Sequence, residues 1–262
     1  MIRRPPRSTQ SRSSAASDVY KRQIEDSVKT LLVEGSSPYE INSYVGSLCK
    51  KYKVKPAFYG QLNQFGMPFP AESCVLVNDE IVHSIPFSRE PFKTNDLVKF
   101  DFGIIYEGFY TDFGFTTLIG NNNQGTKDIK VQTRQQLKNV VEKSVYEAAS
   151  IIKNGISTGD ISSVLQNVTV NSGFLPVHMF CGHGIGRKLH LDPQIPFWGE
   201  KGTGQKVISG MVLCVENWIA EKSNEVILEK DNWTYKLKDG GCSAFKECMI
   251  LVSNNRGEIL SE

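Results

Sequence analysis

Two aspartates in one strand-like stretch are the first residues whose type and spacing could do chemistry. The stretch VKFDFGIIYEGFYTDFGF, residues 98–115, contains Asp-Phe-Gly at Asp101 and again at Asp112. Asp-Phe-Gly also occurs in the magnesium loop of protein kinases. A kinase additionally needs a Gly-rich loop, a lysine strand and a His-Arg-Asp loop upstream, and this sequence has none of them. The repeated tripeptide therefore needs a different explanation.

A β-hairpin brings the two aspartates together. With Glu107 and Gly108 as its turn, Asp112 lies opposite Gly103, and side-chain alternation places Asp101 on the same face as Asp112. Diagonal neighbours in such a pair are about 7 to 8 Å apart, so the two carboxylates could converge on a shared cation. The alternative is that both aspartates are solvated on the outer face of the hairpin.

Further candidate ligands lie in Gly-rich and apolar segments. His183 stands between glycines in VHMFCGHGIGRKLHLDP, residues 177–193, where backbone could approach a compact site, and His190 follows it. A lone histidine is more often a packed core residue than a ligand, but two of only four histidines fall here. Glu216 and Glu247 lie within apolar runs, where a carboxylate needs a cation or a hydrogen-bond donor unless strand alternation exposes it.

Taken together, these residues predict a metal centre. Four carboxylates and one imidazole could neutralise two divalent cations. Ligation by oxygen with a single imidazole suits Co, Mn, Fe or Zn better than it suits a thiolate-bound structural zinc. The candidate ligands are Asp101, Asp112, His183, Glu216 and Glu247.

A repeat indicates how the chain could position these ligands. Two stretches 120 residues apart, 33–45 and 153–165, each predict a helix end at a glycine, followed by a new helix that a capping box begins. Chance similarity of two capping boxes is the alternative to a chain of two related halves. The matched pairs are Gly35 with Gly155, Ser37 with Ser157, and Glu40 with Asp160.

The segments around these helices predict an α+β fold. Helical patterns at 24–33 and 137–153 precede the two capping boxes. Short runs rich in β-branched and aromatic residues favour an antiparallel sheet with helices packed on one face. These runs are CVLVN, DLVKFDFGII, FYTDFGFTTLI, MVLCVENWIA, EVILE, WTYKLK and ECMILVS.

Composition excludes several classes of protein. The chain has 262 residues, 40% hydrophobic and 22% charged, with a net charge of +2 and no long basic stripe, so nothing marks a nucleic-acid surface. Its apolar runs are much shorter than the roughly 20 residues that span a bilayer. The six cysteines are scattered without a Cys-x-x-Cys pair, which favours buried reduced thiols and a reducing compartment.

The first 23 residues differ from the rest of the chain. They are rich in Arg and Ser and lack apolar periodicity, so the sequence predicts that they contribute nothing to the core. A disordered tail, a transit peptide and a foreign segment translated from an adaptor are three interpretations, and the foreign segment is favoured. Residues 24–262 are then the folded domain, and targeting cannot be inferred from this N-terminus.

The motifs, taken in order, resemble type I methionine aminopeptidases, a family with the pita-bread fold. The resemblance covers about residue 24 to the C-terminus. It implies two pseudo-symmetric halves whose curved antiparallel sheet is covered by helices on one face. The motifs are VNDEIVHSIP, Asp-x10-Asp, Gly-His-Gly-Ile-Gly-Arg-x-x-His-x-x-Pro, Gly-Met-x4-Glu and Ser-Ala-x-x-Glu.

The resemblance also implies roles for single residues. Asp112 and Glu247 would bridge two metals, Asp101 would complete one ion, and His183 with Glu216 would complete the other. Glu216 would also move a proton, and His83 and His190 would contact the scissile peptide. Phe69, Cys74 and Trp233 would join His83 and His190 in binding substrate, and Asn78 with Ser243 would hold a monovalent cation.

Several positions depart from the family pattern. Phe245 and Lys246 stand where the family has Gln and an aromatic residue, and Cys248 stands where it has His. Asn217 replaces a Pro after Glu216, and Leu189 replaces an aromatic pocket residue. Because groups behind the ligands tune metal affinity, these changes bear on metal choice and rate.

The function implied is hydrolysis of the initiator methionine from nascent chains by a dimetal aminopeptidase. The implied partner is the N-terminal Met of such chains, with the ribosome as a further candidate, and we expect a monomer that binds neither nucleic acid nor membrane. Cytoplasmic placement is expected, with an organelle as the alternative. A pita-bread X-Pro peptidase and a non-catalytic pita-bread adaptor for ribosome or RNA are the competing hypotheses; such adaptors tend to lose metal ligands, and this chain keeps five.

Overall fold

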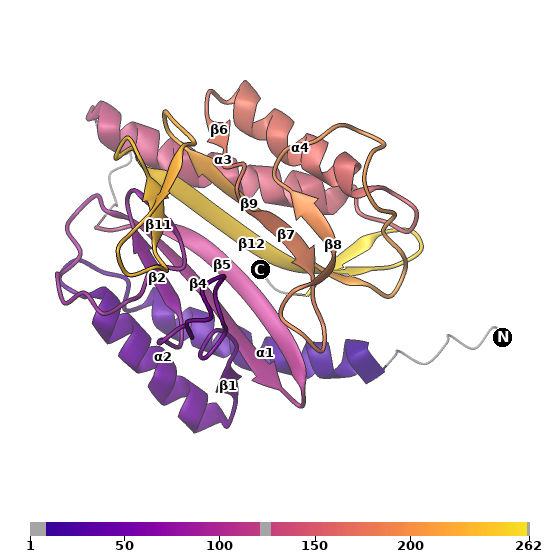
Figure 1. The fold of residues 1–262 in the computed structure, drawn as a ribbon, viewed down its shortest axis with the longest axis horizontal. Helices are drawn as coiled ribbons and strands as arrows, with labels where there is room; N and C mark the ends of the chain where they lie inside the picture. The colour runs from indigo at the N-terminus through magenta and orange to yellow at the C-terminus, as the bar shows by residue number, and fades with distance from the viewer. Residues whose placement is uncertain (1–8, 121–126, 261–262) are drawn as a thin grey trace.

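The computed structural model describes residues 9–120 and 127–260, in which two helix pairs lie along a large curved sheet (Figure 1). The helices are α1 Thr9–Lys29, α2 Pro38–Tyr52, α3 Ile129–Ser150 and α4 Thr158–Asn171. In the described part of the chain, no helix combines the length and the apolar character that a membrane span requires.

The large sheet has the strand order β1-β4-β5-β12-β9-β7-β8, and all of its pairs are antiparallel. Its strands are β1 Lys55–Pro56, β4 Leu97–Tyr106, β5 Phe109–Leu118, β7 Cys181–Gly184, β8 Leu191–Pro196, β9 Val212–Ala220 and β12 Ser243–Val252. Three further strands pair with this path: β2 Cys74–Val77 with β4, β6 Leu175–Pro176 with β9, and β13 Gly257–Ile259 with β12. A small sheet joins β10 Val226–Leu228, β11 Tyr235–Leu237 and β3 Glu80–Val82.

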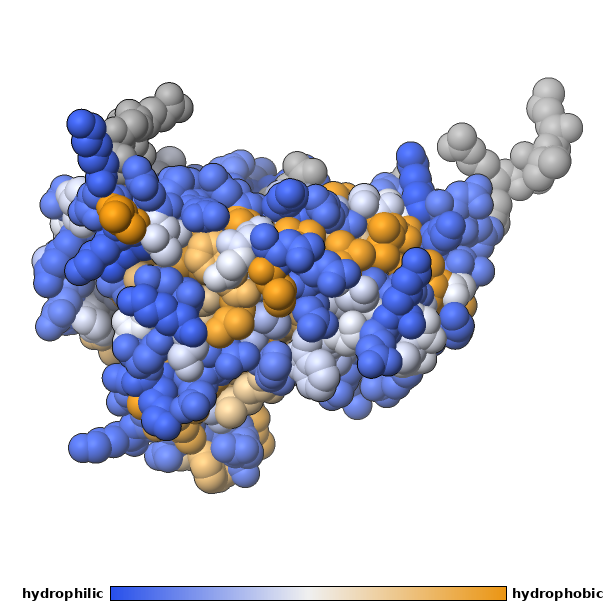
Figure 2. Space-filling model, turned by 90° about the horizontal axis from the view of Figure 1, so that it is seen from above, coloured by the Kyte–Doolittle hydropathy of each residue, from blue (hydrophilic) through white to orange (hydrophobic). Residues whose placement is uncertain are grey.

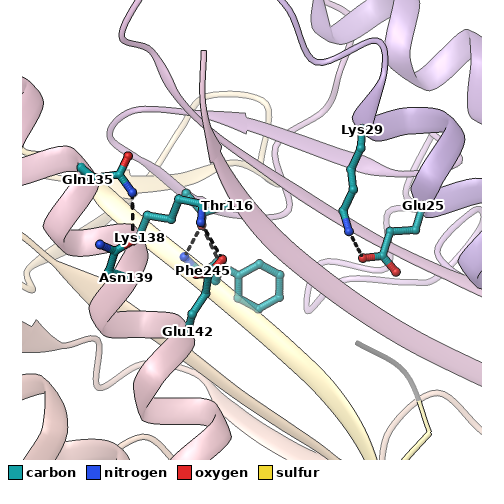
Figure 3. Close-up of polar contacts among 8 residues, drawn as sticks. All are labelled: Glu25, Lys29, Thr116, Gln135, Lys138, Asn139, Glu142 and Phe245. Carbon is teal, nitrogen blue, oxygen red and sulfur yellow. Dashed lines mark hydrogen bonds and ion pairs between the residues drawn. The ribbon is translucent and has the colours of Figure 1, made fainter. Parts of the chain in front are cut away.

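The two halves meet where β5 lies beside β12. Backbone register joins these strands only at Gly114 and Glu247, and side chains make the neighbouring links. The Thr116 hydroxyl donates to Phe245 O at 2.7 Å and accepts from Phe245 N at 2.8 Å (Figure 3). On the helix side of this junction, α1 packs on β5, and α3 packs on β12. The predicted α+β fold with helices on one face is confirmed.

Both capping boxes form as predicted. The Ser37 hydroxyl accepts from Glu40 N, and the Glu40 carboxylate accepts from Ser37 N at the start of α2. Ser157 and Asp160 repeat this arrangement at α4. The helices before them end earlier than the sequence predicts, at Lys29 and Ser150, and short turns lead on to Gly35 and Gly155, whose φ angles are +93° and +90°. The two halves therefore share their helix pairing.

The N-terminal segment departs from expectation, because α1 begins well before residue 24. Residues 1–8 lie outside the described residues, and the chain is helical from Thr9. Lys21 is fully buried, with its ammonium 4.4 Å from the centroid of the Phe113 ring. Ile24 and Glu25 are buried on the same helix. At least part of the segment that was expected to stay outside the fold thus packs against the central sheet.

The predicted hairpin also forms. Gly103 pairs with Asp112, and Tyr106 pairs with Phe109 across the two-residue turn. The turn residues Glu107 and Gly108 have φ angles of +50° and +78°, as a tight turn that matches strand twist requires. This local chemistry fixes the register of β4 and β5, and with it the shared face of the two aspartates.

Candidate metal centre

The candidate ligands lie in one row across four strands. Asp101 of β4 pairs with Gly114 of β5, Gly114 pairs with Glu247 of β12, and Glu247 pairs with Glu216 of β9. Directly paired residues point to the same face, and Asp112 shares this face because it lies two residues before Gly114. Residues far apart in sequence thus converge beside the junction of the two halves.

His183 extends this row from β7. It pairs with Cys214 of β9, and its Nε2 lies 3.9 Å from Asp112 Oδ2. Its Nδ1 lies 3.0 Å from Gly184 O, a contact in which Nδ1–H donates, so the lone pair of Nε2 is directed toward the aspartate. When Asp112 is ionised, two acceptors face each other, an arrangement that suits a cation between them.

The ligand atoms form a compact buried cluster. One donor atom from each of Asp112, His183, Cys214 and Glu247 lies within 4.8 Å of the others. Buried oxygens of Asp101, Asp112 and Glu247 have no hydrogen-bond partner among the described residues. Such oxygens are costly unless a cation satisfies them, so these residues fit a divalent metal centre.

Electrostatics lead to the same conclusion. Burial raises the pKa of Asp112 to about 8. Burial and the charges of neighbouring carboxylates raise the pKa values of Asp101, Glu216 and Glu247 well above their usual range. Without a cation, the four carboxylates cannot all be ionised at neutral pH. A bound divalent cation reverses this by stabilising the ionised forms.

An aromatic stack holds Glu216 in place. Trp218 Nε1 donates to Glu216 Oε2 at 3.1 Å. The Trp218 ring stacks on Phe245 with centroids 3.9 Å apart and planes 10° from parallel. Phe245 fits because Gly114 opposite it has no side chain; a Cβ there would lie 1.8 Å from the Phe245 ring. The departure at Phe245 therefore forms part of the support for a ligand.

Three further departures, Asn217, Lys246 and Cys248, lie behind the site. The Asn217 amide is buried and donates to Ser144 Oγ at 2.9 Å and to Thr169 Oγ1 at 3.0 Å, which ties β9 to α3 and α4. Lys246 is buried with its ammonium 5.6 Å from the centroid of the Tyr146 ring of α3. Cys248 is buried in the core beneath that helix. These side chains belong to the helix side of the sheet.

The two remaining site histidines flank the centre from different elements. The His190 ring lies 4.5 Å from His183, centroid to centroid, and the planes are 83° apart. His83 follows β3 with a φ of +57°, and its ring meets the edge of Trp233 at 5.9 Å. Burial lowers the pKa of both, that of His83 to about 4. Both imidazoles are therefore neutral at neutral pH.

The predicted substrate residues line a cavity of about 690 Å³ that opens onto the ligands. The rings of Phe69 and Trp233 meet edge to face at 5.0 Å, and Cys74 pairs with Asp101 on the neighbouring strand. Leu189 lies in the wall, so the loss of an aromatic residue there leaves an apolar surface. Phe69, Cys74 and Trp233 thus share this cavity, and their role in binding substrate stays a prediction.

Other wall residues were not predicted. Phe180 and Tyr235 pack edge to face at 5.2 Å, and each meets the ring of His83. Tyr235 follows Trp233 by two residues, an alternation that could have pointed to it. Met179 lies at the cavity and is 56% exposed. A view of one face of the molecule shows hydrophobic residues gathered among hydrophilic ones (Figure 2).

Asn78 and Ser243 also lie together, at the turn between β2 and β3. Ser243 N donates to Asn78 O at 3.0 Å, and Ser243 Oγ donates to Glu80 O at 2.9 Å. Their contacts place the first residue of β12 against this turn. The position is thus an intersection of three strands, separate from the row of ligands.

Comparisons with known proteins agree with this geometry. The model of metallopeptidase family M24 matches residues 13–254. The chain is 30% identical over 232 residues to a methionine aminopeptidase of Aquifex aeolicus, covering 87% of this chain and 86% of the relative. It is 32% identical over 236 residues to methionine aminopeptidase 1 of Bacillus subtilis, with 90% of each chain covered.

Solved structures give the same result. The crystal structure of a methionine aminopeptidase from Thermotoga maritima superposes with a TM-score of 0.85 at 33% identity, covering 100% of this chain and 99% of that one. A prolidase from Pyrococcus furiosus, at 17% identity with a TM-score of 0.72, shares the fold and has 64% of its own length covered. With a matching family model, these relatives and a buried cluster that fits a divalent metal, the chain belongs to metallopeptidase family M24.

Proposed function

We propose that this protein removes the initiator methionine from nascent proteins and peptides. The observation that carries the proposal is the position of the metal centre beside an apolar cavity. The cluster of Asp112, His183 and Glu247 lies against the cavity whose wall includes Phe69 and Trp233. A metal centre beside an apolar wall suits a substrate whose free amine binds the metal while its first side chain enters the cavity.

The centre would hold two divalent cations. Asp112 and Glu247 lie between the other ligands in the row and would be shared, while Asp101 lies on one side and Glu216 with His183 on the other. Co, Mn, Fe and Zn suit this set of carboxylates with one imidazole. When bound, such cations lower the pKa of water from about 16 to about 7 and polarise a carbonyl oxygen.

Glu216 would act as the proton carrier. The Trp218 indole donates to one of its oxygens and fixes the carboxylate beside the other ligands. A carboxylate held within reach of the reacting groups could take a proton from water and deliver it to a leaving amine. Glu216 therefore serves both as a ligand and as an acid–base group.

His190 and His83 would bind the scissile peptide. Both are neutral because burial lowers their pKa, so each offers one N–H donor and one acceptor. His190 lies against His183 and would donate to the substrate carbonyl, where negative charge develops. His83, surrounded by Trp233, Phe180 and Tyr235, would orient the peptide nitrogen.

The apolar wall would select methionine. An unbranched thioether suits a pocket of aromatic rings and sulfur, and Phe69, Trp233 and Cys74 supply these groups. The substrate would thus be the N-terminal Met of a nascent or newly released chain.

The test is the release of free methionine from a Met-Ala-Ser peptide by the full chain, first stripped of metal and then titrated with Mn or Co. We expect activity to return with metal and to be absent in Asp112→Asn. The matched control is Asp26→Asn, at an exposed position of α1, which should behave as the parent does. A folded, metal-loaded protein that releases no methionine would contradict the proposal.

Two further measurements separate the competing hypotheses. Cleavage of an X-Pro dipeptide in preference to Met-Ala-Ser would favour an X-Pro peptidase, and a protein that retains no divalent metal would favour an adaptor.

The role of His190 has a test of its own. His190→Ala should lower turnover while metal content stays unchanged, because His190 is placed to touch substrate. Full activity of that variant would remove His190 from the mechanism.

A further inference from the structure

A buried ammonium lies where the resemblance implies a monovalent cation. Lys99 is on β4, is fully buried, and donates from Nζ to Asn78 O at 2.7 Å. Asn78 stands in the turn between β2 and β3 with a φ of +50°. Asn78 and Ser243 are the two residues expected to hold that cation.

The backbone carbonyl oxygen of Asn78 already accepts as many hydrogen bonds as it has lone pairs. Asn78 O accepts from Lys99 Nζ at 2.7 Å and from Ser243 N at 3.0 Å. A carbonyl oxygen has two lone pairs, so these two donors leave none for a metal ion. The single hydroxyl proton of Ser243 donates to Glu80 O at 2.9 Å, which occupies a second oxygen of this turn. A bound monovalent cation therefore does not fit these residues.

We propose that Lys99 supplies the cation of this site as a tethered ammonium, so that the protein needs no monovalent metal ion there. An ammonium group resembles potassium in charge and size, and both are satisfied by carbonyl oxygens. The carboxylates of Asp79 and Glu80 supply opposite charge near Lys99. The inference concerns the scaffold and stands apart from the proposed function.

The Lys99 ammonium lies where the turn between β2 and β3 meets the start of β12. Its partner Asn78 lies between β2, which carries Cys74, and β3, which leads to His83. Ser243 begins β12, which carries Glu247. The contacts of Lys99 and Ser243 with one carbonyl thus join the pocket wall to the strand of the metal ligands. A covalently attached cation keeps this junction closed at any salt composition.

The first test compares salts on the parent protein. The melting temperature of the full chain, with Mn fixed, would be measured in about 0.15 M potassium, sodium or tetramethylammonium chloride, at equal ionic strength. Tetramethylammonium is too large to enter the turn. We expect the same melting temperature in all three salts. A higher melting temperature in potassium or sodium would show that a cation binds beside Lys99 and would overturn the proposal.

The second test removes the ammonium. Lys99→Asn shortens the side chain and frees one lone pair of Asn78 O, so its melting temperature should fall by about 5 to 10 °C in tetramethylammonium chloride. Potassium or sodium should restore a few degrees by binding in the vacated space. The matched control is Lys246→Asn, a buried lysine on the helix side of β12, which should be destabilised without responding to the salt.

Each outcome of these tests either supports or contradicts the proposal. Recovery of Lys99→Asn by small monovalent cations, absent from Lys246→Asn and from the parent, supports the proposal. A Lys99→Asn protein that folds but melts identically in all three salts would contradict it. If Lys99→Asn does not fold, the melting temperatures of the parent protein in the three salts still support or contradict the proposal. Lys99→Arg keeps the positive charge, so it should fold and its melting temperature should not depend on the salt.

Discussion

The two halves of the molecule share a scaffold and differ in the chemistry they present. Each contributes a helix pair joined at a capping box, Ser37 with Glu40 in the first half and Ser157 with Asp160 in the second. The first half supplies only aspartates, both from one hairpin. The second supplies Glu216 and Glu247 from neighbouring strands and adds His183 from β7. A duplicated framework can thus carry an asymmetric site, because the ligands depend on strand positions rather than on the repeat.

The largest expected effect tests the residue at the junction of the halves. Glu247→Gln should lower methionine release by more than about 100-fold, because the proposal makes Glu247 a ligand of both cations, and such a ligand outweighs any supporting group. Asp101→Asn changes a residue at one side of the row, so it should lower methionine release less than Glu247→Gln does. Rates at saturating Mn, together with bound metal per protein, would be measured for both. Glu258→Gln on the neighbouring β13 is the control, and similar losses in the two ligand variants would refute a shared role for Glu247.

The next prediction concerns the support that exists only in the second half. Trp218→Phe keeps a ring against Phe245 but removes the donor to Glu216, so Mn affinity measured by calorimetry should fall about 10- to 100-fold. Trp233→Phe, which alters the pocket wall, should leave that affinity unchanged. Equal affinities in Trp218→Phe and the parent would mean that Glu216 is oriented without the indole.

The third prediction uses the pH dependence of stability with and without metal. The pKa of Asp112 is raised to about 8 in the metal-free fold, so between its unfolded value and pH 8 the folded state binds the proton that the unfolded state has released. Stability of the metal-free protein should therefore fall as pH rises from about 4 to about 8, by up to about 1.4 kcal/mol per pH unit for each such group.

Metal should reverse that trend, because it binds the ionised carboxylates and must displace their protons. Urea unfolding at pH 5 and at pH 7.5, with and without Mn, would measure both slopes. A metal-free protein that is more stable at pH 7.5 than at pH 5 would contradict the assignment of a raised pKa to these carboxylates.

The parts that the sequence predicted correctly are the local ones. A two-residue turn at Glu107 and Gly108 determines the register of its own hairpin, and a capping box is complete within four residues. The pairing of Glu216 with Glu247 could be expected only through the resemblance, because two strands far apart in sequence have to meet in one register.

What the sequence did not indicate depends on tertiary contacts. The strand around His183 is rich in glycine and carries no strand signal, although pairing with β8 and β9 makes it a strand. The start of α1 is Arg- and Ser-rich, and only packing on β5 explains the burial of Lys21. The stack of Phe245 on Trp218 likewise requires the β9–β12 register and the open space at Gly114.

A smaller effect is expected at the glycine of the junction. Gly114→Ala would place a Cβ 1.8 Å from the Phe245 ring, so the stack must shift, at a cost of about 1 to 3 kcal/mol in the free energy of unfolding. Gly46→Ala, inside α2, meets only the Glu72 side chain, at 3.3 Å, and should cost much less, because alanine favours helix and the Glu72 carboxylate, which Asn42 holds, has to shift by only a few tenths of an ångström. Urea unfolding would measure both variants. A Gly114→Ala protein as stable as the parent would show that Phe245 has room to move.

The smallest effect tests whether the two halves are equivalent as scaffolds. Ser37→Ala and Ser157→Ala each remove the hydroxyl of a capping box, and each should cost about 1 kcal/mol, because the same donors lose the same acceptor at α2 and at α4. Since the boxes lie in different halves, the double variant should show the sum to within about 0.5 kcal/mol.

Ser47→Ala, at an exposed interior position of α2, is the control, and it should be neutral or stabilising because alanine favours helix. Urea unfolding of the four variants would give the free energies. A cost at Ser157 several times that at Ser37 would break the equivalence of the two caps. The second half would then depend more on its helix pair, as expected if α3 and α4 also position Asn217 behind Glu216.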